Sequence, residues 1–331
     1  MIITLTANPS IDRTVTLAEP LRRGAVHRAT TATSHPGGKG VNVARVITSA
    51  GRRAIAVLPG NQNEPLLVAL SEAGIEHRAI AHPGAARVNL TVTEPDGTTT
   101  KINEPGAALF PEHLDALATC LRDLSSSAGW VVLSGSLPPG VPDRWYADLV
   151  ATLRAASTAN NPVRIAVDTS DGPLRALAAE FLTAAPDLIK PNAEELGQIV
   201  GTDGLELERA AEEGDPYPTA RAARSLIERG GPQTVLATLG AAGAVLVTPT
   251  GAWHATTPPI APLSTVGAGD SSLAGYLLAD LENAGPADRL VMAVAYGSAA
   301  AALPGTALPS PSHINPDAVT VTALTSILGS S

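Results

Sequence analysis

Residues 264–271 read Ser-Thr-Val-Gly-Ala-Gly-Asp-Ser and stand directly before an Ala- and Leu-rich run with helical spacing. Glycines ahead of a helix let backbone N–H groups face a ligand, and the helix N-terminus adds a positive field. The stretch therefore predicts an anion hole made by Gly267, Ala268 and Gly269. Asp270 would stand at its mouth and could accept a proton from an attacking hydroxyl. A simple helix cap is an equally good interpretation of Asp270 when this motif is taken alone.

The rest of the chain alternates short β-branched runs with longer helical patterns. Strands are expected at 2–7, 54–58, 130–133, 164–168, 188–190, 235–238 and 244–247, and helices at 41–50, 64–73, 142–155, 271–281 and 287–302. This order predicts an α/β fold with a mostly parallel central sheet covered by helices on both faces. The Pro- and Ser-containing tail at 303–312 is expected to connect to a final helix.

Residues 88–103 depart from the alternation of strands and helices. Residues 88–94 alternate with period 2, Pro95-Asp96-Gly97 makes a turn, and residues 98–103 return as a second arm. Residues 14–33 are also strand-like. The two segments predict a small antiparallel sheet outside the main body, which is a candidate lid.

Composition excludes several classes of function. The 331 residues are 44% hydrophobic and 16% charged, which allows a large core, and the net charge of -9 disfavours nucleic-acid binding. No run approaches 18 apolar residues, so no membrane span and a soluble cytoplasmic protein are expected. Cys120 is the only cysteine, and its neighbours Leu117 and Leu121 indicate a small core residue on a buried helix face.

Three further stretches carry polar or glycine-rich turns. Residues 36–42 read Pro-Gly-Gly-Lys-Gly-Val-Asn, without the spacing of a Walker A loop. Residues 190–195 place Asn192 and Glu195 three apart, which suits either a water-rich Mg²⁺ shell or a helix cap with a capping-box glutamate. Residues 238–243 follow a strand, and their glycines permit close approach of a nucleotide phosphate.

Together these motifs resemble the PfkB/ribokinase family of sugar kinases. Residues 37–44 look like its N-terminal motif and residues 265–271 like its C-terminal motif, and the resemblance runs from Ile3 to about Thr306. Residues 4–12 and 133–140 look like those of the phosphosugar kinase branch. The resemblance implies a ribokinase-like three-layer sandwich, a single kinase domain over 1–331, and lid segments at about 12–34 and 87–104.

The resemblance also implies a role for each motif residue. Asp270 matches the catalytic base, and the glycine turn before it matches the anion hole. The residues that match sugar-phosphate-binding positions are Asp12, Gly38, Lys39, Asn42, Arg87, Lys101 and Ser136. Those that match ATP-binding positions are Lys190, Asn192, Thr238, Gly240, Gly243 and Gly269. Asn192 and Glu195 match the motif that organises Mg²⁺, through water.

The branch suggests the substrates but leaves alternatives open. Lys39 stands where minor 6-phosphofructokinases have glycine, and it is shared by the 1-phosphofructokinase and tagatose-6-phosphate kinase branches. The leading hypothesis is transfer of phosphate from ATP to fructose 1-phosphate, giving fructose 1,6-bisphosphate. A tagatose-6-phosphate kinase, a 6-phosphofructokinase of the same family and a catalytically silent sugar-phosphate-binding regulator are the alternatives. A homodimer through the lid is a further expectation.

Overall fold

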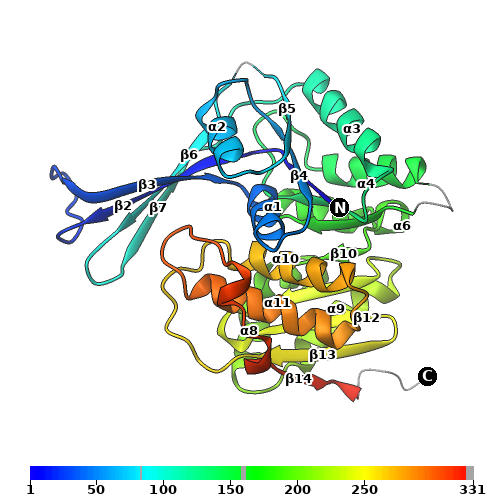
Figure 1. Ribbon diagram of the computed structural model, residues 1–331. Helices are drawn as coiled ribbons and strands as arrows, with labels where there is room; N and C mark the ends of the chain where they lie inside the picture. The colour runs from blue at the N-terminus through cyan, green and yellow to red at the C-terminus, as the bar shows by residue number, and fades with distance from the viewer. Residues whose placement is uncertain (83, 158–161, 326–331) are drawn as a thin grey trace.

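The computed structural model describes residues 1–82, 84–157 and 162–325, and its centre is a ten-stranded sheet (Figure 1). The strand order is β14-β13-β12-β11-β10-β9-β8-β1-β4-β5. All neighbours from β11 to β5 are parallel, and β12, β13 and β14 add an antiparallel edge. These strands are β1 (Ile2–Thr6), β4 (Ala54–Pro59), β5 (His77–Ile80), β8 (Trp130–Ser134), β9 (Arg164–Asp168), β10 (Leu188–Ile189), β11 (Thr234–Thr238), β12 (Ala244–Thr248), β13 (Gly251–Thr256) and β14 (Thr320–Ala323).

Helices cover both faces of this sheet. Successive side chains of a strand point to opposite faces, so an apolar strand needs a covering layer on each side. Ile2 of β1 belongs to one buried cluster, whereas Ile3 and Leu5 belong to the other. The helices are α1 (Lys39–Ser49), α2 (Pro65–Glu72), α3 (Pro111–Ser125), α4 (Trp145–Ala156), α5 (Asp171–Ala179), α6 (Phe181–Ala184), α7 (Ala193–Val200), α8 (Gly204–Glu212), α9 (Tyr217–Glu228), α10 (Ala268–Leu281) and α11 (Pro286–Ala301). The three-layer α/β class predicted from the alternating pattern is confirmed.

The parallel strands bring the motif-bearing loops to one edge. In the sheet register Thr6 of β1 lies beside Ser134 of β8, which lies beside Asp168 of β9. The loops that follow these strand ends therefore meet, as expected for a ligand site of an open α/β sheet. Helix α1 packs directly over β1, since a Cβ on Gly40 would lie 2.5 Å from the carbonyl oxygen of Leu5.

The second sheet projects from the body as a long arm (Figure 1). It contains β2 (Ser10–Leu17), β3 (Ala29–Gly37), β6 (Arg87–Thr93) and β7 (Thr99–Asn103), in the order β3-β2-β6-β7. The predicted hairpin and its turn are confirmed. The prediction of a purely antiparallel lid is wrong in one respect, because the central pair, β2 and β6, is parallel. These strands come from different hairpins, and a local sequence pattern does not show how two hairpins meet.

Three smaller predictions also need correction. The helix expected at 142–155 begins at Trp145. From Pro311 onward the chain forms two short 3₁₀ turns and then β14, an edge strand on β13, instead of a final helix; residues 326–331 lie outside the described residues. Cys120 is half-buried at the edge of the core and not inside it, although Leu117 and Leu121 are buried. In the described part of the chain no helix is long and apolar enough to cross a membrane.

Candidate active site

Asp270 lies in the first turn of α10 and is almost completely buried. The Nδ2 atom of Asn42, on α1, donates a hydrogen bond of 2.8 Å to its Oδ2. Burial raises the pKa of Asp270 to about 6, and the nearby negative charge of Asp168 acts in the same direction. A carboxylate with such a pKa is poised to exchange a proton near neutral pH.

The turn before Asp270 has the backbone that an anion hole requires. Gly267 is the N-cap of α10 and has φ of +76°, a left-handed conformation that favours glycine. The first N–H groups of a helix have no intrahelical acceptor, so those at Gly269 and Asp270 can face a ligand. A Cβ on Gly269 would lie 3.1 Å from Nζ of Lys190, which places an ammonium group beside this helix start.

Asp168, at the carboxyl end of β9, is a site residue that the sequence did not reveal. Its side chain is fully buried, and its two oxygens lie 2.8 Å from Nζ of Lys39 and 3.2 Å from Nζ of Lys190. Burial opposes its ionisation, but the two lysines outweigh that effect and hold its pKa below the usual range. Burial alone would lower the pKa of Lys39, yet Asp168, Glu195 and Asp270 raise it. Its place at the carboxyl end of a buried strand was the sequence signal that could have indicated it.

Asp12 is buried on β2, at the root of the lid. Its Oδ1 accepts hydrogen bonds from Ser10 Oγ at 2.7 Å and from Asn89 Nδ2 at 3.0 Å, so both hairpins of the lid hold it. Gly37 faces this carboxylate, since a Cβ there would lie 2.2 Å from its Oδ2. The glycine of the turn therefore makes room for the carboxylate. Gly38, the next residue, has φ of +108° and is the N-cap of α1.

The predicted phosphate-binding cations lie on the lid strands. Arg87 begins β6, donates from Nη1 to the carbonyl oxygen of Glu104 at 3.1 Å, and has a buried Nε without a partner among the described residues. Lys101 lies on β7, opposite Thr91 of β6, and is exposed. Since strand residues two apart share a face, Lys101, Arg87 and Asp12 lie on the same face of the lid.

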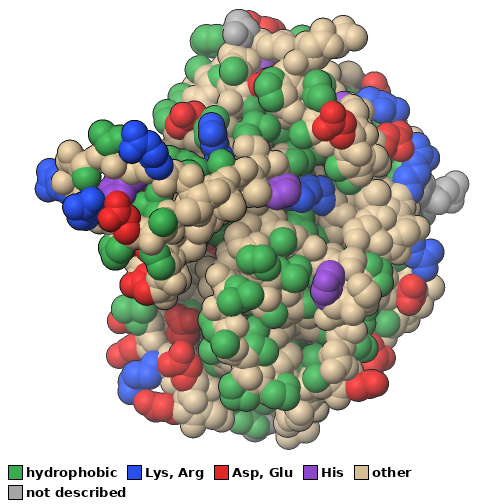
Figure 2. Space-filling view, turned by 60° about the vertical axis from the view of Figure 1, so that its left-hand side comes forward, with side chains coloured by type: hydrophobic (Ala, Val, Ile, Leu, Met, Phe, Trp, Pro, Cys, Tyr) green, Lys and Arg blue, Asp and Glu red, His purple; other side chains and the backbone are tan. Residues whose placement is uncertain are grey.

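Ser136 follows β8 and lies 3.4 Å from Nδ2 of Asn8, which anchors the loop after β1 by donating to the carbonyl oxygen of Pro105. Its side chain is otherwise exposed at the same edge of the sheet. Figure 2 shows Lys and Arg side chains on the projecting sheet and a group of mainly Asp and Glu side chains on the body below it. Besides Arg87 and Lys101, the lid carries Arg13, Arg22, Arg23 and Arg28, which are all exposed.

Asn192 and Glu195 form the capping box of α7. Asn192 Oδ1 accepts from the Glu195 N–H at 2.8 Å, and Glu195 Oε2 accepts from the Asn192 N–H at 2.9 Å. The second carboxylate oxygen of Glu195 is left for a water, and burial raises the pKa of this group. In the described ranges no three or more His, Cys, Asp or Glu side chains group closely enough to hold a metal ion directly. This donor set fits Mg²⁺ held mainly through water.

A cavity of about 400 Å³ adjoins the start of α10. It brings together four of the predicted ATP-binding residues, Thr238, Gly240, Gly243 and Gly269. Lys190 and Asn192 do not line it; Lys190 lies beside the helix start, and Asn192 forms a backbone bridge with Thr238. The cavity continues between α11 and the proline-rich loop at 257–262. Its volume and the glycines that line it beside the start of α10 suit a nucleotide.

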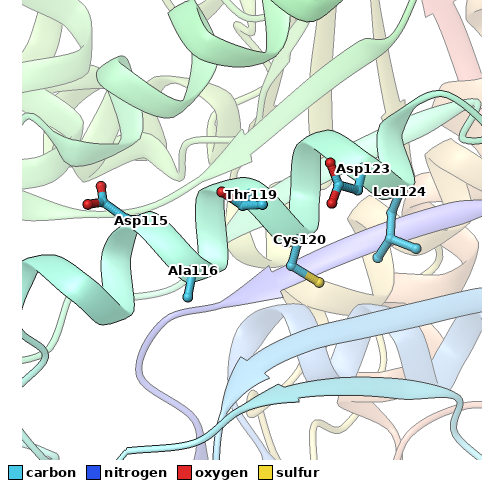
Figure 3. A pocket seen from close by; sticks show the side chains of 6 residues that line it. All are labelled: Asp115, Ala116, Thr119, Cys120, Asp123 and Leu124. Carbon is cyan, nitrogen blue, oxygen red and sulfur yellow. The ribbon is translucent and has the colours of Figure 1, made fainter.

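A second hollow lies on the outer face of α3, and Cys120 and Leu124 line it together with four further residues of that helix (Figure 3). Burial raises the pKa of the Cys120 thiol, which makes it less reactive. Because one helix alone supplies the lining, this hollow lacks the convergent groups of a binding site.

The fold and the site define a phosphotransferase of the kinase type. The sequence profile described as pfkB family carbohydrate kinase matches residues 5–313, and the chain belongs to this family. It is 36% identical to the 1-phosphofructokinase of Rhodobacter capsulatus, with 98% of each chain covered. It is 32% identical to the ATP-dependent 6-phosphofructokinase isozyme 2 of Escherichia coli, with 93% of this chain and 94% of that protein covered.

Among solved structures, the Escherichia coli phosphofructokinase-2 in complex with substrates and products is similar to this fold. The TM-score is 0.83 at 31% identity, with 94% of this chain and 96% of that chain covered. The family resemblance inferred from the glycine-rich motifs is thereby confirmed.

Proposed function

We propose that this chain transfers the γ-phosphoryl group of ATP to the 6-hydroxyl of fructose 1-phosphate, giving fructose 1,6-bisphosphate and ADP. The observation that carries the proposal is the buried Asp270, oriented by Asn42 at the mouth of the helix-start anion hole. A carboxylate at this point repels phosphate in the ground state and serves best as a general base. A protein that only bound sugar phosphates would have no use for it.

In this mechanism the acceptor site orients the hydroxyl for attack. Asp12 accepts hydrogen bonds from the sugar hydroxyls, and Asp270 accepts the proton of the 6-hydroxyl as its oxygen attacks the γ-phosphorus. The bond from phosphorus to the β–γ bridging oxygen breaks, and ADP leaves. The N–H groups of Gly269 and Asp270 would stabilise the charge that develops on the transferred group, whereas the Ala268 N–H, which the sequence also assigned to this hole, donates to the carbonyl oxygen of Thr265.

Arg87 and Lys101 would hold the phosphate that the substrate already carries. The unpartnered buried Nε of Arg87 supports this role, since a buried donor without an acceptor is costly unless a ligand satisfies it. Both cations lie on the same lid face as Asp12, which supports the binding of one sugar phosphate along this face. Gly38, Lys39 and Ser136 would complete this acceptor site.

On the donor side, Thr238, Gly240, Gly243 and Gly269 would cradle the nucleotide, with Lys190 near its phosphates. Asn192 and Glu195 would hold Mg²⁺ through water, and the ion would supply charge neutralisation at the phosphates. Fixing α7 through its capping box keeps both side chains in place for this task.

The choice of phosphosugar rests on similarity. Lys39 and the named relatives favour fructose 1-phosphate, while a 6-phosphofructokinase isozyme is also similar and tagatose 6-phosphate is the nearest chemical alternative. A coupled assay of ADP release with fructose 1-phosphate, fructose 6-phosphate and tagatose 6-phosphate tests the proposal. The highest kcat/KM is expected with fructose 1-phosphate. A preference for another of these sugars would contradict the substrate, and no turnover with any would favour the regulator.

We further propose that residues 1–331 act as one kinase domain and that two copies pair through their lids. The exposed face of the lid opposite Asp12 includes Ile102, which is 57% exposed. A tetrameric inhibited form is described for the Escherichia coli phosphofructokinase-2, so assembly occurs in this family. Size-exclusion chromatography with light scattering distinguishes a dimer from a monomer, and Ile102→Glu should favour the monomer if the lids pair.

A further inference from the structure

Arg45 is a half-buried cation in the middle of α1 that the proposed mechanism does not use. It follows Asn42 by three residues, and its helix neighbours Ala44 and Val46 are fully buried. Burial lowers the pKa of its guanidinium, and the negative charge of Asp12 opposes that effect. His35, on β3, is the other titratable group near it. Removing a cation partly from water is costly unless partners compensate it, so the partners of Arg45 indicate its task.

The first partner is the side chain that holds the base. Arg45 Nη1 donates to Asn42 Oδ1 at 3.4 Å, while Asn42 Nδ2 donates to Asp270 at 2.8 Å. A guanidinium can only donate, so it faces the oxygen of the amide and leaves the amide nitrogen for the carboxylate. The opposite orientation would set the NH₂ group against a cation and the oxygen against an anion. Arg45 therefore selects the amide orientation that supports an ionised Asp270.

The second partner belongs to the sugar side of the site. The same Nη1 donates to the carbonyl oxygen of Pro36 at 3.1 Å. Pro36 lies beside Ile11 in the lid sheet, and it precedes Gly37, which faces the Asp12 carboxylate. The Arg45 guanidinium therefore connects two parts of the acceptor site. One is the backbone of Pro36 beside Asp12, and the other is the Asn42 amide that contacts Asp270. Asp12 comes from a strand of the lid and Asp270 from helix α10, so a contact that spans both parts can fix the position of one carboxylate relative to the other.

We propose that Arg45 is a positioning residue of the acceptor site, which fixes the Asn42 amide toward Asp270 and the Pro36–Gly37 backbone beside Asp12. This role rests on the proposed function. It predicts a loss confined to the use of the phosphosugar, because the described residues that line the nucleotide cavity all lie outside α1.

The test combines Arg45→Met, Arg45→Lys, Asn42→Ala and the double variant Arg45→Met/Asn42→Ala. Arg45→Met should lower kcat/KM for fructose 1-phosphate roughly 10- to 100-fold, since misplacement by about 1 Å can cost about 100-fold. KM for ATP should change less than about twofold, and Arg45→Lys, which keeps a cationic donor, should recover part of the loss. The double variant should lose clearly less than the product of the two single losses, because part of the effect runs through Asn42.

Arg52→Met is the matched control, since Arg52 is an exposed arginine just beyond α1 that pairs with Glu282 at the surface. It should leave kcat/KM unchanged. If the loss in the double variant equals the product of the two single losses, Arg45 does not have this role. The same follows if KM for ATP rises as much as KM for fructose 1-phosphate. Thermal unfolding with and without ATP reports folding, and if Arg45→Met does not fold, Arg45→Lys enters the same cycle. A wild-type chain without turnover would remove the proposed function and this role together, whereas an active chain with multiplying losses would remove the role alone.

Discussion

The proposed acceptor and donor ends of the site are lined by different kinds of side chain. At the acceptor end, Asp12, Asp168 and Asp270 are buried carboxylates, each held by side-chain contacts of between 2.7 and 3.2 Å. At the donor end, the 400 Å³ cavity is lined by glycine, alanine, proline, valine and isoleucine, and its only polar side chains in the described residues are the hydroxyls of Thr238, Thr257, Thr265, Ser272 and Ser298.

This difference separates two ways of recognising a ligand. Buried charges reject any group that fails to pair with them, because an unpaired buried charge is costly. Apolar walls and hydroxyls tolerate changes in polarity, since a hydroxyl can both donate and accept. The acceptor end should therefore be strict and sensitive to mutation, and the donor end permissive.

The largest loss is expected from Asp270→Asn, which keeps the shape but cannot accept a proton. Turnover should fall by about 10²- to 10⁴-fold, the usual contribution of a general base, with little change in KM for ATP. Asp288→Asn is a matched control, because Asp288 occupies the same position in the first turn of α11 and is exposed. Near-native turnover of Asp270→Asn would exclude the base role.

Asp168→Asn should produce the largest change in stability. It leaves two lysines without their shared anion, and removing one partner of a buried ion pair costs about 3–5 kcal/mol. Denaturant unfolding measures this change in the free energy of unfolding. Asp123→Asn, at an exposed site on α3, should shift it by less than about 0.5 kcal/mol. Equal shifts in the two variants would mean that the lysines do not depend on Asp168.

Arg87→Ala and Lys101→Ala should raise KM for the phosphosugar far more than KM for ATP. Each removes a charge-assisted hydrogen bond worth about 1.5–3 kcal/mol, or tenfold and more in KM. Arg13→Ala is the matched control on the lid, since Arg13 is exposed and lies on the opposite face from Asp12. Equal effects on both substrates would show that the two cations only support the lid fold.

The pH profile should report the raised pKa of Asp270. The base acts as a carboxylate, so kcat/KM should rise with pH through about 6 and fall tenfold for each pH unit below it. An acidic limb near pH 4, the range of an ordinary aspartate, would contradict a buried base at this position. The limb should also be absent from the residual activity of Asp270→Asn.

The smallest effect is expected from exchanging the nucleotide base. Thr257 Oγ1 and Ser298 Oγ lie 3.2 Å apart in the cavity and can each donate or accept toward adenine or guanine. GTP should therefore support turnover with kcat/KM within about tenfold of ATP, a difference below about 1.4 kcal/mol. A much larger preference for ATP would show that backbone groups of the loop at 257–262 select the base.

The local pattern of the sequence determined most of the fold and the motif residues. The alternation of β-branched and helical runs predicted the layered α/β body, because period and composition reflect burial on two faces. The period-2 arms around Pro95-Asp96-Gly97 predicted the hairpin. Glycine turns before helices predicted Gly38 and Gly267, both of which have positive φ and begin a helix.

Only the tertiary structure decided how these pieces act on one another. Asn42 and Asp270 are 228 positions apart in the sequence and share a hydrogen bond because α1 and α10 pack together. Asp168 gains its two lysines, and β2 its parallel partner β6, from the order in which distant strands meet. The raised pKa of Asp270 likewise depends on burial by several elements. Sequence spacing reports neighbours along the chain, whereas contacts, burial and charge depend on which distant segments the fold brings together.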